Sequence, residues 1–164
     1  MTDIKKSHSS VKFELLGEEA TVALGGQIAD AIASIKAPLL ITLTGDLGAG
    51  KTTLSRGILQ RLGHVGAVKS PTYTLIEPYE LPLGAVYHCD LYRLADAEEL
   101  EYMGFADYLT HAALCLVEWP EKGEGFLPRP SVAVQISSSQ RGRCVTLEAN
   151  SAEGIHLIGQ LKGL

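Results

Sequence analysis

The sequence predicts an α/β fold, a single domain with a central, mostly parallel sheet, flanking antiparallel strands and helices on both faces. Two short and nearly continuous apolar runs, 39–43 and 113–117, are typical of strands buried on both faces. Other segments have the period of amphipathic helices, and the alternation of the two kinds favours an α/β architecture. The 164 residues, of which 46% are hydrophobic and 20% charged, suit one domain over 11–164 after a flexible N-terminus over 1–10.

Each element follows from a local pattern. Alternating apolar residues predict the first strand, and Pro38 ends the helix that follows it. The β-rich stretches on either side of Pro82 and Gly84 predict one hairpin, and those around the polar turn SSSQRG predict another. The predicted strands are 11–15, 39–43, 73–80, 84–91, 113–117, 132–136 and 144–147. The predicted helices are 18–36, 54–62, 95–103 and 155–161.

Charge and cysteine content exclude several classes of protein. Fourteen Lys and Arg against nineteen Asp and Glu give a net charge of -5, so we expect no direct DNA binding and contact with RNA only through a partner. Cys89, Cys115 and Cys144 are odd in number and far apart, which favours buried thiols over disulfides or a zinc site. With no apolar run of membrane-spanning length and no secretory signal, the expected location is the cytoplasm.

The strongest motif is Gly45–Thr52, which matches G-x-x-x-x-G-K-[ST] at every fixed position. It follows a buried strand and precedes a helix, where backbone N–H groups and the helix N-terminus converge on an anion. Lys51 is expected to reach the β- and γ-phosphates of ATP, and the Thr52 hydroxyl to ligate Mg²⁺. The predicted ligands of ATP or ADP are Asp46, Leu47, Gly48, Ala49, Gly50, Lys51, Thr52 and Thr53.

A phosphate loop of this kind needs a carboxylate near the metal, at the end of a neighbouring strand. Glu118 ends the run AALCLVE and Asp90 ends AVYHCD, and their spacing does not rank them. Either could ligate the ion while the other positions the attacking water. Thr72, in SPTYT, is placed where switch loops sense the γ-phosphate through the metal. The expected catalytic residues are therefore Lys51, Thr72, Asp90 and Glu118.

Three further side chains have two interpretations each. His88 is either a packed strand residue, which we favour, or a base. Arg93 either neutralises the transferring phosphoryl group or pairs with Glu98 or Glu99. Trp119 is either half-buried packing or an aromatic contact for a partner, and Arg141 or Arg143 are candidates for the adenine side. The N-K-x-D element of guanine-specific switches is absent, which favours ATP over GTP.

Several segments together resemble the bacterial TsaE family, formerly YjeE. They are GDLGAGKTT, SPTYTLIEPYE, YHCDLYRLADAEELEYMGFADYL and LVEWPEKGEGFLP, which cover most of residues 45–128 in the family's order. The resemblance implies a P-loop NTPase fold and a slow, Mg²⁺-dependent ATPase that acts with the TsaB and TsaD proteins. That assembly installs threonylcarbamoyl on adenosine 37 of ANN-decoding tRNAs, and this chain would meet tRNA only indirectly. By position, Thr52 and Glu118 would hold the metal, and Asp90 would belong to the catalytic or nucleotide-sensing part.

Two other functions remain open from the residues. A small-metabolite kinase rests on the phosphate loop alone, and the absence of an arginine-rich lid weakens it. A nucleotide-gated interaction module, in which hydrolysis is secondary, would use Trp119 and the acidic stretch 96–101 as its contact surface.

Overall fold

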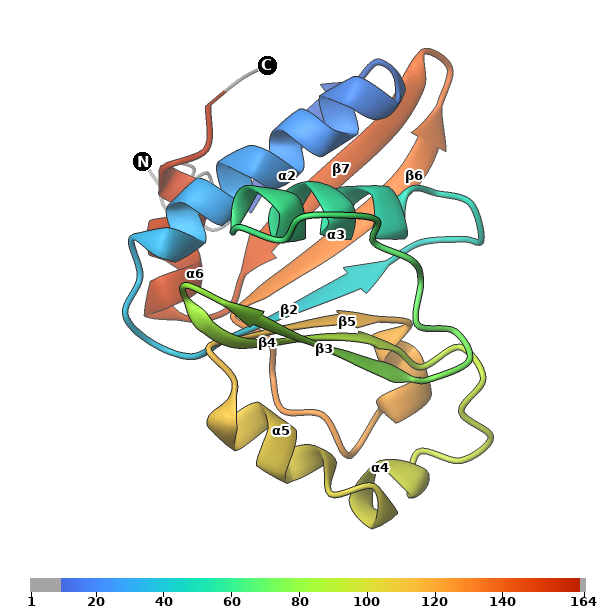
Figure 1. The fold of residues 1–164 in the computed structure, drawn as a ribbon. Helices are drawn as coiled ribbons and strands as arrows, with labels where there is room; N and C mark the ends of the chain where they lie inside the picture. The colour runs from blue at the N-terminus through green and yellow to red at the C-terminus, as the bar shows by residue number, and fades with distance from the viewer. Residues whose placement is uncertain (1–9, 163–164) are drawn as a thin grey trace, which may run out of the picture.

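A seven-stranded sheet with helices on both faces organises the protein (Figure 1). The computed structural model describes residues 10–162. The strands are β1 (Ser10–Leu15), β2 (Leu39–Thr44), β3 (Ile76–Leu81), β4 (Gly84–Asp90), β5 (Leu114–Glu118), β6 (Val132–Ser139) and β7 (Gly142–Ala149). The helices are α2 (Gly17–Ala33), α3 (Lys51–Arg61), α4 (Glu99–Tyr102), α5 (Phe105–His111) and α6 (Ala152–Gly159), with a 3₁₀ turn η1 (Pro120–Gly123).

The sheet is parallel at its centre and antiparallel at both flanks. Its strand order is β1-β7-β6-β2-β5-β4-β3. β2 pairs in parallel with β5 and β6, and β4 pairs in parallel with β5. The other three pairings, β1 with β7, β6 with β7 and β3 with β4, are antiparallel. The predicted α/β class with antiparallel additions is therefore confirmed, although only half of the six pairings are parallel.

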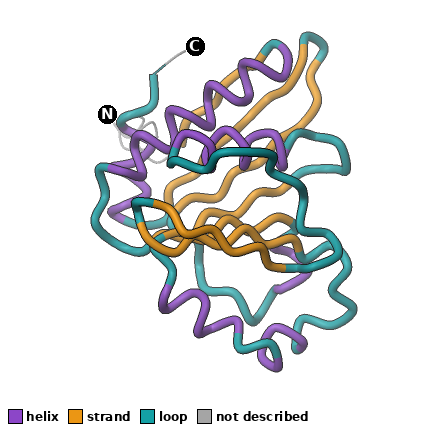
Figure 2. The backbone as a smooth tube through the Cα atoms, viewed as in Figure 1, coloured by secondary structure: helices purple, strands orange, loops and turns teal. Residues whose placement is uncertain are grey.

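Two hydrophobic clusters cover the two faces of the sheet. One lies under α2, α3 and α6, and the other lies under α4 and α5, which occupy the opposite side of the strands in Figures 1 and 2. The central strands are buried from both sides, as their continuous apolar runs predicted: β5 is buried along its whole length and β2 at all but its last residue. This layering brings the carboxyl ends of β2, β4 and β5 to one edge of the sheet.

The structure corrects several predicted boundaries. The helix predicted over 95–103 is a single turn at Glu99–Tyr102, and Gly104 (φ 68°) then starts α5, which the sequence interpretation missed. The strand predicted from 73 begins at Ile76, because Leu75 adopts a left-handed conformation (φ 65°) and 71–75 form a turn instead.

The N-terminal prediction falls mostly outside the described residues. Residues 1–9 of the segment expected to be flexible lie there, whereas Ser10 already forms the start of β1. Within 10–162, no helix combines the length and the apolar character needed to cross a membrane.

Candidate nucleotide-binding site

The loop between β2 and α3 is shaped by glycines at positions that exclude other side chains. Gly48 and Gly50 have φ angles of 77° and 114°, which L-residues with a Cβ rarely adopt. Gly45 passes so close to β6 that an added Cβ would lie 2.5 Å from the carbonyl oxygen of Ile136. The loop therefore curls tightly at the edge of the sheet and ends at Lys51, the first residue of α3.

Lys51 is folded back onto its own loop. Its ammonium donates hydrogen bonds to the carbonyl oxygens of Gly45 and Asp46, the latter at 3.0 Å, and lies 4.3 Å from the ring centroid of Trp119. Burial lowers the pKa of Lys51, and the nearby carboxylates of Glu118 and Asp90 oppose that shift. The side chain is only 5% exposed, so its charge is held close to the loop.

Glu118 meets the Thr52 hydroxyl from the neighbouring strand. Its two carboxylate oxygens lie 3.3 and 3.4 Å from Thr52 Oγ1. On its other side, Oε2 lies 2.5 Å from Nε2 of His88, which is fully buried on β4. His88 Nδ1 has no hydrogen-bond partner in the part of the chain that the structure describes. The hydroxyl, the carboxylate and the imidazole thus form one row at the sheet edge.

Asp90 belongs to a separate set of contacts. Its Oδ2 accepts hydrogen bonds from Ser70 Oγ at 2.7 Å and from Thr72 Oγ1 at 3.2 Å. Its Oδ1 accepts one from the backbone N–H of Tyr92 at 2.9 Å. Although Asp90 and Glu118 are directly paired across β4 and β5, Glu118 faces the phosphate loop and Asp90 faces the 70–74 loop. The structure thus shows that Glu118 and Asp90, which the sequence left as equal candidates for the metal ligand, have different contacts.

One cavity of about 340 Å³ joins these groups. Asp46 and Ala49 do not line it, and Asp46 instead supplies a carbonyl oxygen to Lys51. The residues expected from sequence that line it are Leu47, Gly48, Gly50, Lys51, Thr52, Thr53, Thr72, Asp90 and Glu118. Lining residues without a predicted role in phosphate binding or catalysis are Ser70, Tyr92, Trp119 and Arg143.

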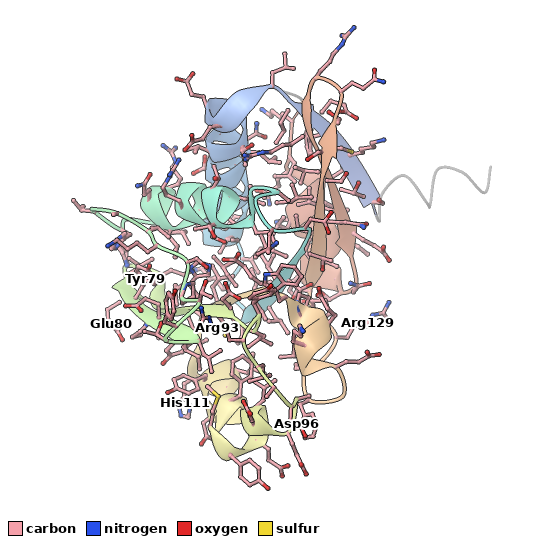
Figure 3. The ribbon with its side chains drawn as sticks, turned by 90° about the vertical axis from the view of Figure 1, so that its right-hand side faces the viewer. Tyr79, Glu80, Arg93, Asp96, His111 and Arg129 are labelled. Carbon is pink, nitrogen blue, oxygen red and sulfur yellow. The ribbon has the colours of Figure 1, made fainter. Side chains whose placement is uncertain are left out.

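The side chains with two interpretations are now placed. His88 is buried as favoured, but its contact with Glu118 was missed, because only the register of β4 against β5 brings the two together. Arg93 is exposed, stacks 4.1 Å from the Tyr73 ring and forms no ion pair with Glu98 or Glu99 (Figure 3). Trp119 is half-buried and packs 4.9 Å from the ring of Tyr92, with its backbone in the left-handed region (φ 58°).

The oxygen atoms of the site suit a magnesium ion that shares its coordination with phosphate. Thr52 and Glu118 offer a hydroxyl and a carboxylate within 3.4 Å of each other. Among residues 10–162 there is no group of three or more His, Cys, Asp or Glu side chains arranged to hold a metal. Mg²⁺ commonly needs only one or two protein oxygens when phosphates and water complete its shell, so the donor set fits that ion.

A strand, a glycine loop and a helix N-terminus, with a carboxylate from the adjacent parallel strand, together define the P-loop NTPase-like fold. Comparisons with known proteins specify the class further. The family model "Threonylcarbamoyl adenosine biosynthesis protein TsaE" matches residues 15–145. The chain therefore belongs to the TsaE family, which takes part in tRNA threonylcarbamoyladenosine biosynthesis.

Individual relatives agree with this assignment. The chain is 52% identical over 120 residues to the tRNA threonylcarbamoyladenosine biosynthesis protein TsaE of Haemophilus influenzae, covering 73% of this chain and 76% of that protein. Its identity to the protein of the same name from Bacillus subtilis is 41% over 97 residues, 59% of this chain and 60% of the relative. The crystal structure of Bacillus subtilis YdiB superposes with a TM-score of 0.74 and 30% identity, over 92% of this chain and 93% of YdiB.

Proposed function

We propose that this protein binds ATP with Mg²⁺ and hydrolyses it slowly to ADP and phosphate, and that this activity serves tRNA threonylcarbamoyladenosine synthesis. The observation that carries the proposal is the meeting of Thr52 and Glu118 inside the cavity that Lys51 also lines. A phosphate-loop hydroxyl and a carboxylate from the adjacent parallel strand form the pair that holds Mg²⁺ in P-loop NTPases.

Each side chain has a definite task in the proposed reaction. Lys51 exchanges its hydrogen bonds to Gly45 and Asp46 for the β- and γ-phosphates, and the backbone N–H groups of the loop bind the same phosphates. Mg²⁺ held by Thr52 and Glu118 would neutralise negative charge on the β- and γ-phosphates. Water attacks the γ-phosphorus, the bond to the β–γ bridging oxygen breaks, and ADP and phosphate leave.

Asp90 has a different task, as its contacts indicate. It holds Ser70 and Thr72 at the cavity edge, so a change at the γ-phosphate can reach the 70–74 loop, whose Tyr73 and Thr74 are exposed, through two hydrogen bonds. Loops ordered in this way report the nucleotide state to other proteins. The proposed recipients are TsaD and TsaB in the cytoplasm. The net charge of -5 supports a role in which tRNA is bound by the assembly rather than by this chain.

The test is phosphate release by purified protein, alone and with TsaB and TsaD. We expect slow turnover that the partners accelerate, and a loss of about a hundredfold in Lys51→Ala and in Glu118→Gln. Lys36→Ala removes an exposed lysine remote from the cavity and serves as the matched control. Wild-type turnover by Lys51→Ala, or the absence of stimulation by the partners, would contradict the corresponding half of the proposal.

A nucleotide-gated interaction module is the second candidate, and the rim of the cavity favours it. Leu47 on the phosphate loop is 68% exposed, and Tyr73 on the 70–74 loop is 82% exposed although Arg93 stacks on its ring, so two large side chains beside the site present apolar surface to solvent. In this case an ATP analogue that cannot be cleaved would support assembly with TsaD and TsaB, and ADP would not. Equal assembly with the analogue, with ADP and without nucleotide would exclude nucleotide gating.

A further inference from the structure

Arg143 reaches the candidate nucleotide cavity from β7, near one flank of the sheet. It lies on β7, paired with Leu15 of β1 and Ser138 of β6, and lines the same cavity as Lys51 and Thr53. Its guanidinium rests on Gly50, where an added Cβ would lie 2.3 Å from Nη1 and 2.8 Å from Cζ. Gly50 thus both supplies the left-handed turn of the loop and leaves the space that the guanidinium occupies.

One nitrogen of the guanidinium is a buried donor that has no acceptor among the described residues. Arg143 Nη1 is buried and makes no hydrogen bond within residues 10–162. Arginine keeps its charge at all ordinary pH values, so it cannot relieve this cost by losing a proton. Glu18 is already ion-paired with Arg56. That ion pair is the main cause of the lowered pKa of Glu18, which Arg143 also helps to lower. A buried cationic donor in a cavity lined by the phosphate loop is best satisfied by an anion.

The order of the strands indicates from which side Arg143 would approach the phosphates of a bound nucleotide. β5, which ends at Glu118, lies on one side of β2, whereas β6 and then β7 lie on the other. Glu118 and Thr52 would hold Mg²⁺ on the β5 side, where the ion would neutralise charge on the phosphates of a bound nucleotide. Arg143 therefore faces the phosphate chain from the opposite flank, next to the Gly50 backbone.

We propose that Arg143 binds the diphosphate common to ADP and ATP and sets the affinity of the site for both, rather than acting on the γ-phosphate alone. This inference rests on the proposed function, because it requires that the cavity take a nucleotide. It assigns to a C-terminal hairpin residue a role that the phosphate-loop motif does not contain.

The test measures ADP, ATP and pyrophosphate binding by calorimetry, with Mg²⁺, for wild type, Arg143→Met and Arg129→Met. Methionine keeps the apolar stem of Arg143 and removes its donors. We expect Arg143→Met to weaken all three ligands to a similar degree, by about tenfold to a hundredfold, since a charge-assisted hydrogen bond is lost. Arg129 is exposed and does not line the cavity, so Arg129→Met makes the same charge change and should bind like wild type.

Several outcomes distinguish this inference from the proposed function. Binding of ADP by Arg143→Met as tight as by wild type would overturn the inference and leave the proposed function intact, and so would a loss confined to ATP. Wild-type protein that binds neither nucleotide would overturn both. Arg143→Lys, which keeps the charge but not the paired donors, should show an intermediate loss and replaces the methionine variant should that fail to fold. The thermal midpoint of nucleotide-free Arg143→Met should not fall, because a buried unsatisfied donor has been removed.

Discussion

At the scale of single residues, the site depends on what each carboxylate is bonded to. Glu118 is fixed between the Thr52 hydroxyl and the His88 imidazole, whereas Asp90 is fixed by two hydroxyls of the 70–74 loop and one backbone N–H. Two carboxylates at the ends of adjacent strands therefore have different surroundings. The difference supports the proposed roles, in which Glu118 would bind the metal and Asp90 would position the loop.

His88 offers a test of that division, because it contacts Glu118 without lining the cavity. In His88→Phe, Glu118 loses a hydrogen-bond donor and is no longer fixed toward Thr52. We expect the Mg²⁺ concentration for half-maximal ATP hydrolysis to rise about tenfold or more, as is usual when a partner of a metal ligand is lost. His88→Gln, which retains an N–H donor, should recover part of the loss. An unchanged Mg²⁺ dependence in His88→Phe, with the fold intact by circular dichroism, would show that His88 only packs.

Trp119 provides a direct signal of the phosphate site. It is the chain's single tryptophan, and the Lys51 ammonium lies 4.3 Å from its ring. When Lys51 turns toward phosphates, the charge next to the ring changes, so we expect tryptophan fluorescence to change on addition of ADP or ATP. Lys51→Met should abolish most of that change. A wild-type spectrum that stays constant at saturating nucleotide would mean that Lys51 keeps its contact with the ring.

At the scale of elements, the position of α3 depends on glycines in the crossing of α2 and α3. A Cβ on Gly25 would lie 2.7 Å from the carbonyl oxygen of Leu54, and one on Gly57 would lie 2.5 Å from that of Val22. The two helix backbones therefore touch, and neither residue can carry a side chain without moving a helix. Because α3 begins at Lys51, this crossing also places the phosphate loop.

Neighbouring glycines of α2 give a matched pair of variants. We expect Gly25→Ala to destabilise the protein by about 1–3 kcal/mol, because backbone atoms must move apart. Gly26 has open space, with the nearest atom 4.0 Å from an added Cβ, so Gly26→Ala should be neutral or stabilise by up to about 1 kcal/mol through helix propensity. Urea unfolding of both variants measures the difference. Equal stability of the two would show that the crossing tolerates a wider spacing.

At the scale of the whole molecule, the sheet separates two cores of different content. The core beneath α4 and α5 contains Cys89 and Cys115, both nearly inaccessible, whereas Cys144 on β7 is partly exposed. Burial raises the pKa of Cys115 to about 12 and, together with Cys115 and Asp90, raises that of Cys89 well above its usual 9.0. The prediction that the cysteines are buried thiols is confirmed for these two and is only partly correct for Cys144.

These thiols should respond to pH and to alkylation in a defined way. Their raised folded-state pKa values stabilise the fold fully below pH 9, and this contribution is lost as the pH rises from 9 towards 12, because unfolding then releases protons. In the native protein we expect alkylation of Cys144 alone, read by mass spectrometry, with all three labelled in denaturant. Labelling of Cys89 or Cys115 at the rate of Cys144 would reveal opening of the second core.

The sequence alone determined the elements whose signals are local. The continuous apolar runs identified β2 and β5, and the loop motif with its glycines located Lys51 and Thr52, because these patterns lie within a few residues of chain. Local signals failed where a turn decided the outcome: Gly104 starts α5, and the left-handed Leu75 delays β3.

Only the tertiary structure decided which distant groups share the site. The pairing of β4 with β5 sets His88 beside Glu118, the 70–74 loop binds Asp90, and β7, separated from β2 by β6, brings Arg143 to Gly50. Such contacts join residues far apart in the chain, and they depend on strand order, register and backbone packing rather than on the identity of neighbouring residues. For that reason the sequence located the phosphate loop and proposed Thr72, Asp90 and Glu118 beside it, whereas the fold showed how these groups contact one another and added Ser70, His88 and Arg143.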